Sequence, residues 1–267
     1  MPTVRANGLN LHYEERGAGE PLLLLMGLGG HGALWEEHAH AYAAHFRCLL
    51  LDNRGAGRSD KPPGPYTIAA MADDALGLLD AIGVARAHVS GISMGGAIAQ
   101  ELALRAPERV QSLTVVSSWV KCDAYAARIF DMLRALAAAA DPAAFTRLLQ
   151  LWIFTPAYHT AHMDDLLRRE RAGLAHPHPM PAFAFQAQCD ACLAHDTRGR
   201  LARVAAPALV TAGDRDIFTP LAFSQELAAS IPGADLRVFA GGGHAHHWEM
   251  REDFNRTTLA FMRRHRM

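Results

Sequence analysis

The stretch Gly91-Ile92-Ser93-Met94-Gly95-Gly96 decides how the rest of this sequence is interpreted. It follows the strand-like segment 87–90 and precedes a stretch with helical character, so it predicts a strand, a tight turn and a helix. Such a turn strains the serine backbone, and the flanking glycines, which lack a Cβ atom, let the strand and the helix close around it. We therefore expect the Ser93 hydroxyl to project from the end of a sheet, where it can act as a nucleophile.

Short apolar segments alternate with helical segments along much of the chain. Eight segments have the length and composition of strands: 3–6, 10–15, 21–26, 46–51, 88–92, 113–118, 208–212 and 236–240. The first two surround Asn7-Gly8-Leu9 and predict a hairpin, whereas 66–82 and 94–105 have helical periodicity. Buried strands separated by helices are typical of a mostly parallel sheet covered on both faces. The sequence therefore predicts an α/β fold with an eight-stranded, mostly parallel sheet.

The alternation stops between Trp119 and Arg200. This segment is rich in helical patterns and contains no strand signal. Open α/β sheets bind their ligands at the carboxyl ends of the strands. We therefore expect residues 119–200 to form a helical cap over that edge, on a core made of residues 1–118 and 201–267.

The composition favours a small-molecule ligand. Of the 267 residues, 50% are hydrophobic, and the formal net charge of −1 gives no field that would attract nucleic acid or anionic lipid. The apolar run 22–26 is too short to span a bilayer, the first residues lack a signal-peptide pattern, and four cysteines do not form a secreted disulfide framework. We expect a cytoplasmic protein with no nucleic-acid or membrane partner, and a homodimer stays an open alternative.

The 15 histidines and four cysteines do not predict a metal centre. His244-Ala245-His246-His247 and His176-Pro177-His178 lack the H-E-x-x-H or paired-cysteine spacing of zinc sites. Cys189-Asp190-Ala191-Cys192 is a single C-x-x-C, which we interpret as a packing pair on a helix. Gly27-Leu28-Gly29-Gly30 is not followed by the spacing of a phosphate-binding loop. We therefore expect neither a metal nor a cofactor.

A serine nucleophile needs a base, an acid that orients the base, and donors for the oxyanion. Asp216 follows the predicted strand 208–212, and His244 follows the predicted strand 236–240. Both therefore fall at the same sheet edge as Ser93, in the chain order serine, aspartate, histidine. Asp214 is an alternative acid. The sequence predicts Ser93, His244 and Asp216 as a catalytic triad.

Backbone N–H groups suit an oxyanion hole because they are fixed dipoles that need no reorganisation. The N–H of Met94 begins the helix after Ser93, where the helix dipole adds to it. The second donor is expected in the glycine-rich loop after 21–26, and Leu28 is our choice because Gly27 and Gly29 allow a tight turn there.

Taken together, these motifs resemble the α/β-hydrolase superfamily over essentially the whole chain. The resemblance rests on Met26-Gly27-Leu28-Gly29-Gly30, the segment 52–60 (Asp-Asn-Arg-Gly-Ala-Gly-Arg-Ser-Asp), the turn at Ser93, Gly213-x-x-Asp216 and Gly243-His244. It implies that Asp216 is the acid, that His244 is the base and that Leu28 supplies an oxyanion N–H. This chain departs from the pattern of many members in having Met26-Gly27 where they have His-Gly.

Within the superfamily, two segments resemble the group of 3-oxoadipate enol-lactonases and aminoacrylate or carbamate hydrolases. They are Gly27-Leu28-Gly29-Gly30 with the following Trp35, and Ser118-Trp119-Val120-Lys121-Cys122-Asp123 at the entrance to the predicted cap. That group implies cleavage of a small ester, lactone, amide or carbamate that carries a carboxylate. Ser93 argues against dehalogenases and epoxide hydrolases, which have an aspartate there. Hydrolases of carbon–carbon bonds remain an alternative, although Ala245 stands where they carry a tryptophan. A ligand-binding or sensor protein that keeps the fold is a further alternative.

The walls of the substrate site are expected to come from the predicted cap and the glycine-rich loop. Gly29 and the aromatic residues Trp119, Trp152 and Phe154 are candidates for an apolar wall. A substrate carboxylate would require a cation that faces Ser93, and Lys121 and Arg128 are the candidates. Arg54 is expected to hold its own glycine-rich loop together.

Overall fold

A twisted sheet forms the centre of the protein, for which a computed structural model describes residues 2–266. The eight strands lie in the order β1-β2-β4-β3-β5-β6-β7-β8. Their bounds are β1 (Thr3–Ala6), β2 (Leu9–Arg16), β3 (Glu20–Leu25), β4 (Phe46–Leu51), β5 (Ala87–Ile92), β6 (Val110–Val116), β7 (Ala208–Gly213) and β8 (Asp235–Phe239). β2 pairs antiparallel with β1 and β4, and all other neighbours are parallel. The predicted mostly parallel sheet is confirmed.

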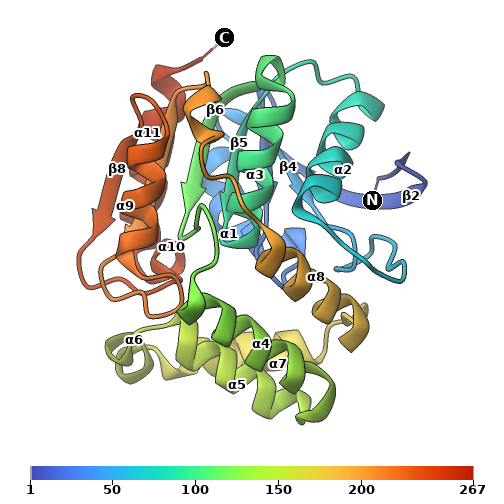
Figure 1. The fold of residues 1–267 in the computed structure, drawn as a ribbon, viewed down its shortest axis with the longest axis vertical. Helices are drawn as coiled ribbons and strands as arrows, with labels where there is room; N and C mark the ends of the chain where they lie inside the picture. Colours follow the sequence, from blue (N-terminus) through green and yellow to red (C-terminus); the bar gives the residue numbers. More distant parts are fainter. Residues whose placement is uncertain (1, 267) are drawn as a thin grey trace.

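Helices cover both faces of this sheet (Figure 1). One face is covered by α2 (Ile68–Ala81), α3 (Met94–Arg105) and α9 (Leu221–Ser230), and the other by α1 (Glu36–Tyr42) and α11 (Arg251–Arg264). α10 (His246–Glu249) is a short helix between β8 and α11. α2 begins after Thr67, whose side chain accepts a hydrogen bond from the N–H of Ala70 at 3.0 Å, an N-cap that explains why the helix starts two residues later than predicted.

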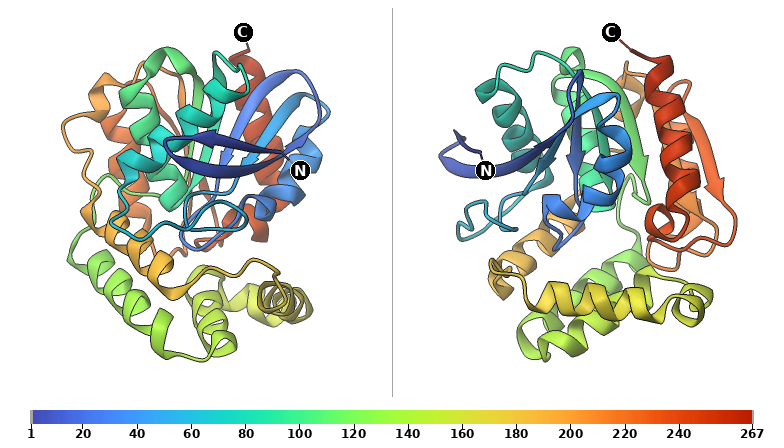
Figure 2. Two further views of the ribbon diagram at one scale, coloured as in Figure 1. Left: turned by 90° about the vertical axis from the view of Figure 1, so that its right-hand side faces the viewer. Right: turned by 180° about the vertical axis from the view of Figure 1, so that it is seen from behind.

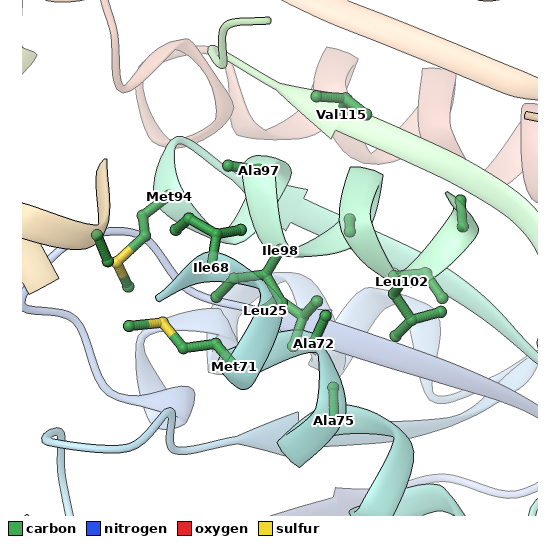
Figure 3. Close-up of a cluster of buried hydrophobic side chains, with 14 of the residues drawn as sticks. Leu25, Ile68, Met71, Ala72, Ala75, Met94, Ala97, Ile98, Leu102 and Val115 are labelled. Atoms are coloured by element: carbon green, nitrogen blue, oxygen red, sulfur yellow. The ribbon is translucent and has the colours of Figure 1, made fainter. Parts of the chain in front are cut away.

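The core consists of two clusters, one on each side of the sheet. Leu23 and Leu25 of β3 belong to one cluster, and Leu22 and Leu24 to the other, because successive side chains of a strand point to opposite faces. Figure 3 shows the first cluster, in which Leu25 packs among side chains of α2 and α3. This packing explains why β3 is a continuous run of apolar residues rather than an alternating one.

The strand register brings four strand ends to one edge. Leu25 of β3 lies beside Gly91 of β5, and Val116 of β6 lies beside Ile92 on one side and Thr211 on the other. β6 ends earlier than predicted because Ser117 adopts a positive φ of 45° and turns the chain out of the strand. Gly213 of β7 in turn lies beside Phe239 of β8. The loops that follow β3, β5, β7 and β8 therefore meet at the carboxyl edge of the sheet.

Five further helices lie at one end of the sheet, as Figures 1 and 2 show. We call them the helical layer: α4 (Ala124–Ala139), α5 (Pro142–Ile153), α6 (Pro156–Ala161), α7 (Met163–Leu174) and α8 (Ala182–Ala194). α4 packs against α8, and α5 packs against α7. A single β-bridge between Lys121 and Asp196 joins the two ends of this segment. Across residues 2–266, no helix is long and apolar enough to cross a membrane.

Candidate active site

Ser93 occupies the turn between β5 and α3 in a strained conformation, with φ 53° and ψ −118°. A Cβ atom on Gly91 would overlap the carbonyl oxygen of Gly95, and one on Gly95 would overlap that of Leu25, so both positions require glycine. The N–H of Ser93 donates to the carbonyl of Val116 at 2.8 Å, and the Ser118 hydroxyl donates to the carbonyl of Ser93 at 2.9 Å. These bonds hold the strained turn in place.

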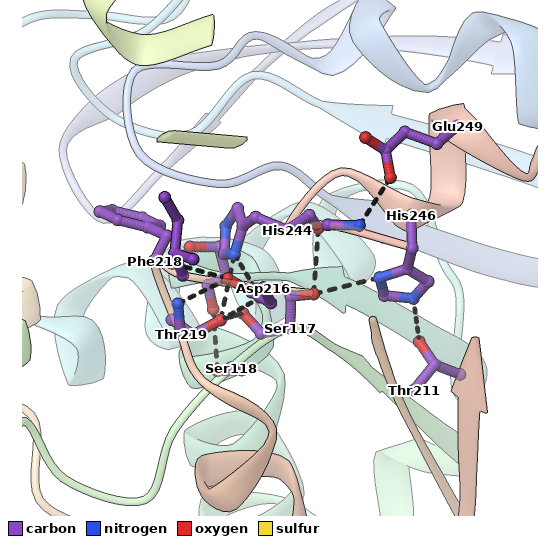
Figure 4. Close-up of polar contacts among 12 residues, drawn as sticks. Ser117, Ser118, Thr211, Asp216, Phe218, Thr219, His244, His246 and Glu249 are labelled. Atoms are coloured by element: carbon purple, nitrogen blue, oxygen red, sulfur yellow. Dashed lines mark hydrogen bonds and ion pairs between the residues drawn. The ribbon is translucent and has the colours of Figure 1, made fainter. Parts of the chain in front are cut away.

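Asp216 and His244 are in direct contact. The Nδ1 atom of His244 lies 2.9 Å from Oδ2 of Asp216, and both residues are 5% exposed. Asp216 also accepts the N–H groups of Phe218 and Thr219, each at 2.8 Å, and the Thr219 hydroxyl at 2.8 Å (Figure 4). A carboxylate can only accept, so the shared proton sits on Nδ1, and Nε2 of His244 is left with its lone pair.

The environment of Asp216 keeps it ionised. Burial acts to raise the pKa of this carboxyl group, but the positive charge that His244 carries when it is protonated and the hydrogen bonds from His244 and Thr219 outweigh it and hold the pKa below its usual value. The alternative acid, Asp214, instead accepts the N–H of Gly241 at 2.6 Å. The structure therefore pairs His244 with Asp216.

Polar residues that the sequence analysis missed support this pair. The Ser117 hydroxyl donates to the carbonyl of His244 at 3.0 Å, and the Thr219 hydroxyl also lies 3.2 Å from the carbonyl of Ser117. Glu249 accepts the N–H of Gly243 and the N–H of Thr155, each at 2.6 Å, which ties the His244 loop to the helical layer. The spacing of Asp216 and Thr219, in which an aspartate precedes a hydroxyl residue by three positions in a turn, is a signal that could have revealed Thr219.

The glycine-rich loop after β3 packs directly against Ser93. A Cβ atom on Gly27 would lie 3.2 Å from that of Ser93, so glycine allows this close approach. The N–H of Gly29 donates to Oε1 of Gln188 at 2.9 Å, and Nε2 of Gln188 donates to the carbonyl of Arg54 at 2.9 Å. No sequence pattern marks Gln188, which lies on α8 and is fully buried.

The two predicted oxyanion donors are the N–H groups of Leu28, in the loop after β3, and of Met94, directly after Ser93 in the sequence. Leu28 lines the same cavity as Ser93, and the neighbouring N–H of Gly29 is already engaged by Gln188. Met94 is the first residue of α3, so its N–H has no acceptor within the helix. The role of these two N–H groups as oxyanion donors stays a prediction.

A cavity of about 340 Å³ contains Ser93 and His244. Strand-end loops form one part of its lining, including Met26, Leu28, Gly29 and Ile92. The helical layer and the loop before α8 supply apolar side chains: Leu133, Phe145, Leu149, Ile153, Met180 and Phe185. Among the described residues, the lining includes no lysine or arginine. The cavity therefore suits a small and largely apolar group.

Three aromatic residues expected in the wall lie elsewhere, while Gly29 is in the lining. Trp119 is fully buried and packs against Phe130, with ring centroids 5.3 Å apart. Trp152 lies in another surface groove at the C-terminal end of α5, beside Thr155 and His159, and does not line the cavity. Phe154 follows the helix and stacks on Tyr158, at 5.0 Å, and on Trp248.

The two cations expected to face Ser93 do not do so. Lys121 is 44% exposed and pairs with Asp196 at 3.5 Å, and it does not line the cavity. Arg128 is exposed, because α4 turns Ile129 and Leu133 inward and leaves Arg128 on its outer face. The prediction that either residue binds a substrate carboxylate is therefore wrong for this structure.

Arg54 pairs with the buried carboxylate of Asp74 through two hydrogen bonds of 2.6 and 2.7 Å.

Cys189 and Cys192 are buried free cysteines, and burial raises the pKa of both thiols. Within residues 2–266, no group of three histidine, cysteine, aspartate or glutamate residues is arranged to hold a metal ion.

Comparison with known proteins agrees with this fold. The family model described as alpha/beta hydrolase fold matches residues 20–250. The proposed carbamate hydrolase RutD of Azorhizobium caulinodans is 36% identical over 262 residues, which cover 98% of each chain.

Solved structures are similar over nearly the full length. The enol-lactonase from Burkholderia xenovorans LB400 has a TM-score of 0.90 and 28% identity, over 98% of this chain and 99% of that chain. A hydrolase from Pseudomonas aeruginosa PA01 has a TM-score of 0.88 and 32% identity, over 98% of this chain and 97% of that chain. These matches confirm the resemblance drawn from the motifs. The chain belongs to the α/β hydrolase fold family, and it is a hydrolase.

Proposed function

We propose that this protein is a cofactor-independent serine hydrolase that cleaves a small, uncharged ester, lactone, amide or carbamate through an acyl-enzyme on Ser93. The observation that carries the proposal is the contact between His244 and Asp216 at the cavity that also contains Ser93. Among relatives, RutD is named for carbamate hydrolysis and the Burkholderia xenovorans protein for enol-lactone hydrolysis. Both reactions transfer an acyl or carbamoyl group to water, so one triad serves either.

The proposed reaction begins when Nε2 of His244 takes the proton of the Ser93 hydroxyl as the oxygen attacks the carbonyl carbon. Asp216 fixes the tautomer of His244 and stabilises the imidazolium that forms. The N–H groups of Leu28 and Met94 donate to the oxyanion. His244 then protonates the leaving group, and a water molecule activated by His244 releases the acyl group from Ser93.

In this proposal the helical layer is a cap that excludes water and shapes the acyl site. The absence of lysine and arginine from the described lining argues for an uncharged substrate, because a carboxylate moved out of water without a cationic partner loses its hydration uncompensated. Two p-nitrophenyl esters of similar size test this point. We expect the butanoate ester to be hydrolysed with a higher kcat/KM than the mono-succinate ester, and a preference for the succinate would contradict an uncharged substrate.

The mechanism is tested by the release of p-nitrophenol from p-nitrophenyl acetate. We expect wild type to be active and Ser93→Ala to be inactive, with the same far-ultraviolet circular dichroism. A burst of p-nitrophenol, together with an acetyl adduct on the peptide that contains Ser93, would identify the acyl-enzyme. Turnover by Ser93→Ala at a rate near wild type would refute the proposal.

A further inference from the structure

A second cavity adjoins the one that contains Ser93 and His244. Its volume is about 640 Å³, compared with about 340 Å³ for the first cavity. Six residues line both cavities: Gly29, Leu34, Leu149, Ile153, Met180 and Trp248. Each of these six residues is partly exposed, whereas Ser93 and His244 are buried. The boundary between the two cavities is therefore not a closely packed layer of side chains.

The boundary consists mostly of flexible apolar side chains. Leu149 lies on α5, Met180 lies on the loop before α8, and Leu34 lies on the short helix Gly32–Trp35. A methionine side chain has three rotatable bonds and adapts to the shape of its neighbours. Small rotamer changes at this boundary can thus let a chain that is attached to the reacting carbonyl group extend from the first cavity into the second.

The charged residues of the second cavity are paired within the protein. Each of its five acidic and arginine residues has an ion-pair partner: Glu36 with Arg16, Glu37 with Arg169 and Arg251, and Asp165 with Arg168 and Arg169. These pairs neutralise one another, so they give an ionic ligand little net attraction. Burial lowers the pKa of His31, and the neighbouring His176 lowers it further, which favours the neutral form of His31. The second cavity therefore favours an uncharged ligand.

Much of the remaining lining is apolar. Five of the six shared residues have apolar or aromatic side chains, and Ala33, Phe154, Ala172 and Pro179 add to them in the second cavity. Transfer of an apolar group from water to such a surface is favourable. The cavity is thus suited to an alkyl or aryl group rather than to a strongly hydrated one.

We propose that the second cavity is a further part of the substrate site, and that it binds an uncharged alkyl or aryl chain attached to the group that is cleaved at Ser93. This inference rests on the proposed function and makes it more specific, because it describes the part of the substrate beyond the small group at Ser93. The chain belongs either to the acyl group or to the leaving alcohol, and two pairs of esters distinguish these cases.

Thr146 is suited to the test because it lines the second cavity and not the first. It lies on α5, and its hydroxyl donates only to the carbonyl of Pro142 on the same helix, at 2.9 Å. Thr146→Phe adds a ring that fills part of the second cavity. Ala144→Phe is the matched control, since it adds the same ring at an exposed position of α5 that lines neither cavity.

The kinetic test compares long and short esters. p-Nitrophenyl octanoate and butanoate differ in the acyl group, and octyl acetate and butyl acetate differ in the alcohol. We expect wild type to prefer the longer ester of one pair, with a gain in kcat/KM of up to about fourfold for each buried methylene group. Thr146→Phe should reduce this preference by roughly 10- to 20-fold, the worth of two displaced methylene groups, and Ala144→Phe should retain it.

A binding measurement separates this inference from the proposed mechanism. Methyl octanoate, methyl butanoate, octyl acetate and butyl acetate are titrated into Ser93→Ala and into Ser93→Ala/Thr146→Phe. The fluorescence of the protein is the readout, since Trp248 lines both cavities. We expect tighter binding of a longer ester in Ser93→Ala, and a smaller difference in the double variant. This measurement gives a result even if wild type cleaves none of the esters, an outcome that would count against the proposed function alone.

Three results would overturn the inference. The first is a wild type that prefers the longer ester of neither pair, in kinetics and in binding. The second is a Thr146→Phe variant that changes kcat/KM for the long and the short ester by the same factor, as expected if the second cavity only admits substrate or is not used. The third is a higher kcat/KM for the p-nitrophenyl mono-suberate ester than for the octanoate, which would contradict an uncharged chain.

Discussion

Gln188 offers a direct test of how the helical layer controls the oxyanion loop. Its side chain accepts the N–H of Gly29 and donates to the carbonyl of Arg54, both at 2.9 Å, and it is fully buried. Gln188→Leu keeps a side chain of similar size but removes both bonds. The N–H of Gly29 and the carbonyl of Arg54, both partly buried, then lose these partners.

The magnitude follows from these two groups. A fully buried unsatisfied group costs about 1–3 kcal/mol, and these two groups are partly buried, so the free energy of unfolding should fall by about 1–3 kcal/mol in total. Loss of one oxyanion donor lowers kcat by about 10²–10³. Gln188 acts on Leu28 only through the loop, so we expect a smaller loss, roughly 10- to 100-fold in kcat, with KM changed less than about threefold.

The matched control is Gln186→Leu on the same helix. Gln186 is partly exposed and donates to the carbonyl of Arg134 at 3.1 Å, away from the oxyanion loop. Steady-state kinetics with p-nitrophenyl acetate and urea unfolding are measured for both variants, with circular dichroism to show that each is folded. Gln188→Glu retains an oxygen that can accept the N–H of Gly29, and it should keep more of kcat than the leucine variant. The reasoning is refuted if folded Gln188→Leu has the kcat of Gln186→Leu.

Three further changes test the strain, the buried histidines and the buried ion pair. Because Ser93 has a positive φ of 53°, Ser93→Gly should be at least as stable to urea as Ser93→Ala. Glycine variants are usually less stable than alanine variants, so this order is the reverse of the usual one. A clearly less stable glycine variant would show that the turn is unstrained. Burial lowers the pKa of His195 from 6.5 to about 4, so between these values the unfolded state binds more protons and the free energy of unfolding falls as the pH falls. Urea unfolding at several pH values from 7 to 5 gives the slope of the free energy of unfolding against pH. This slope should be lower in His195→Gln than in wild type by up to about 1.4 kcal/mol per pH unit, and identical slopes would contradict a neutral buried His195. Arg54→Leu leaves the carboxylate of Asp74, which is 2% exposed, without its charged partner, and should lower the free energy of unfolding in urea by about 3–5 kcal/mol. Arg54→Leu/Asp74→Leu should recover part of that loss. A double variant as unstable as the single one would argue against an uncompensated buried charge.

The sequence predicted the sheet and the positions of its strand ends well, because these depend on local patterns. Continuous apolar runs such as Leu22 to Leu25 identify strands that are buried on both faces. The glycines around Ser93 identify a turn whose backbone only certain residues can adopt. The order of Ser93, Asp216 and His244 at successive strand ends then follows from the parallel connections of the sheet.

The cavity wall could not be predicted in the same way. Which side chains of α5 reach the cavity depends on where that helix lies against the sheet and the other helices, so Phe145 and Leu149 line the site and Trp152, at the end of the helix, does not. A tryptophan on a helix has the same sequence signal whether it faces a substrate, the core or a surface groove. The sequence favoured Asp216 as the acid and kept Asp214 as an alternative, and the path of one loop pairs Asp216 with His244.

Local patterns thus predict the scaffold and the turn that carries Ser93, since spacing and chain geometry act over a few residues. The groups that support this turn are identified from the folded chain alone. Gln188 reaches Gly29 across 159 positions of sequence, and no local pattern records a contact between residues so far apart. The second cavity is likewise visible only when every neighbour is in place, because segments that are far apart in the sequence form its walls.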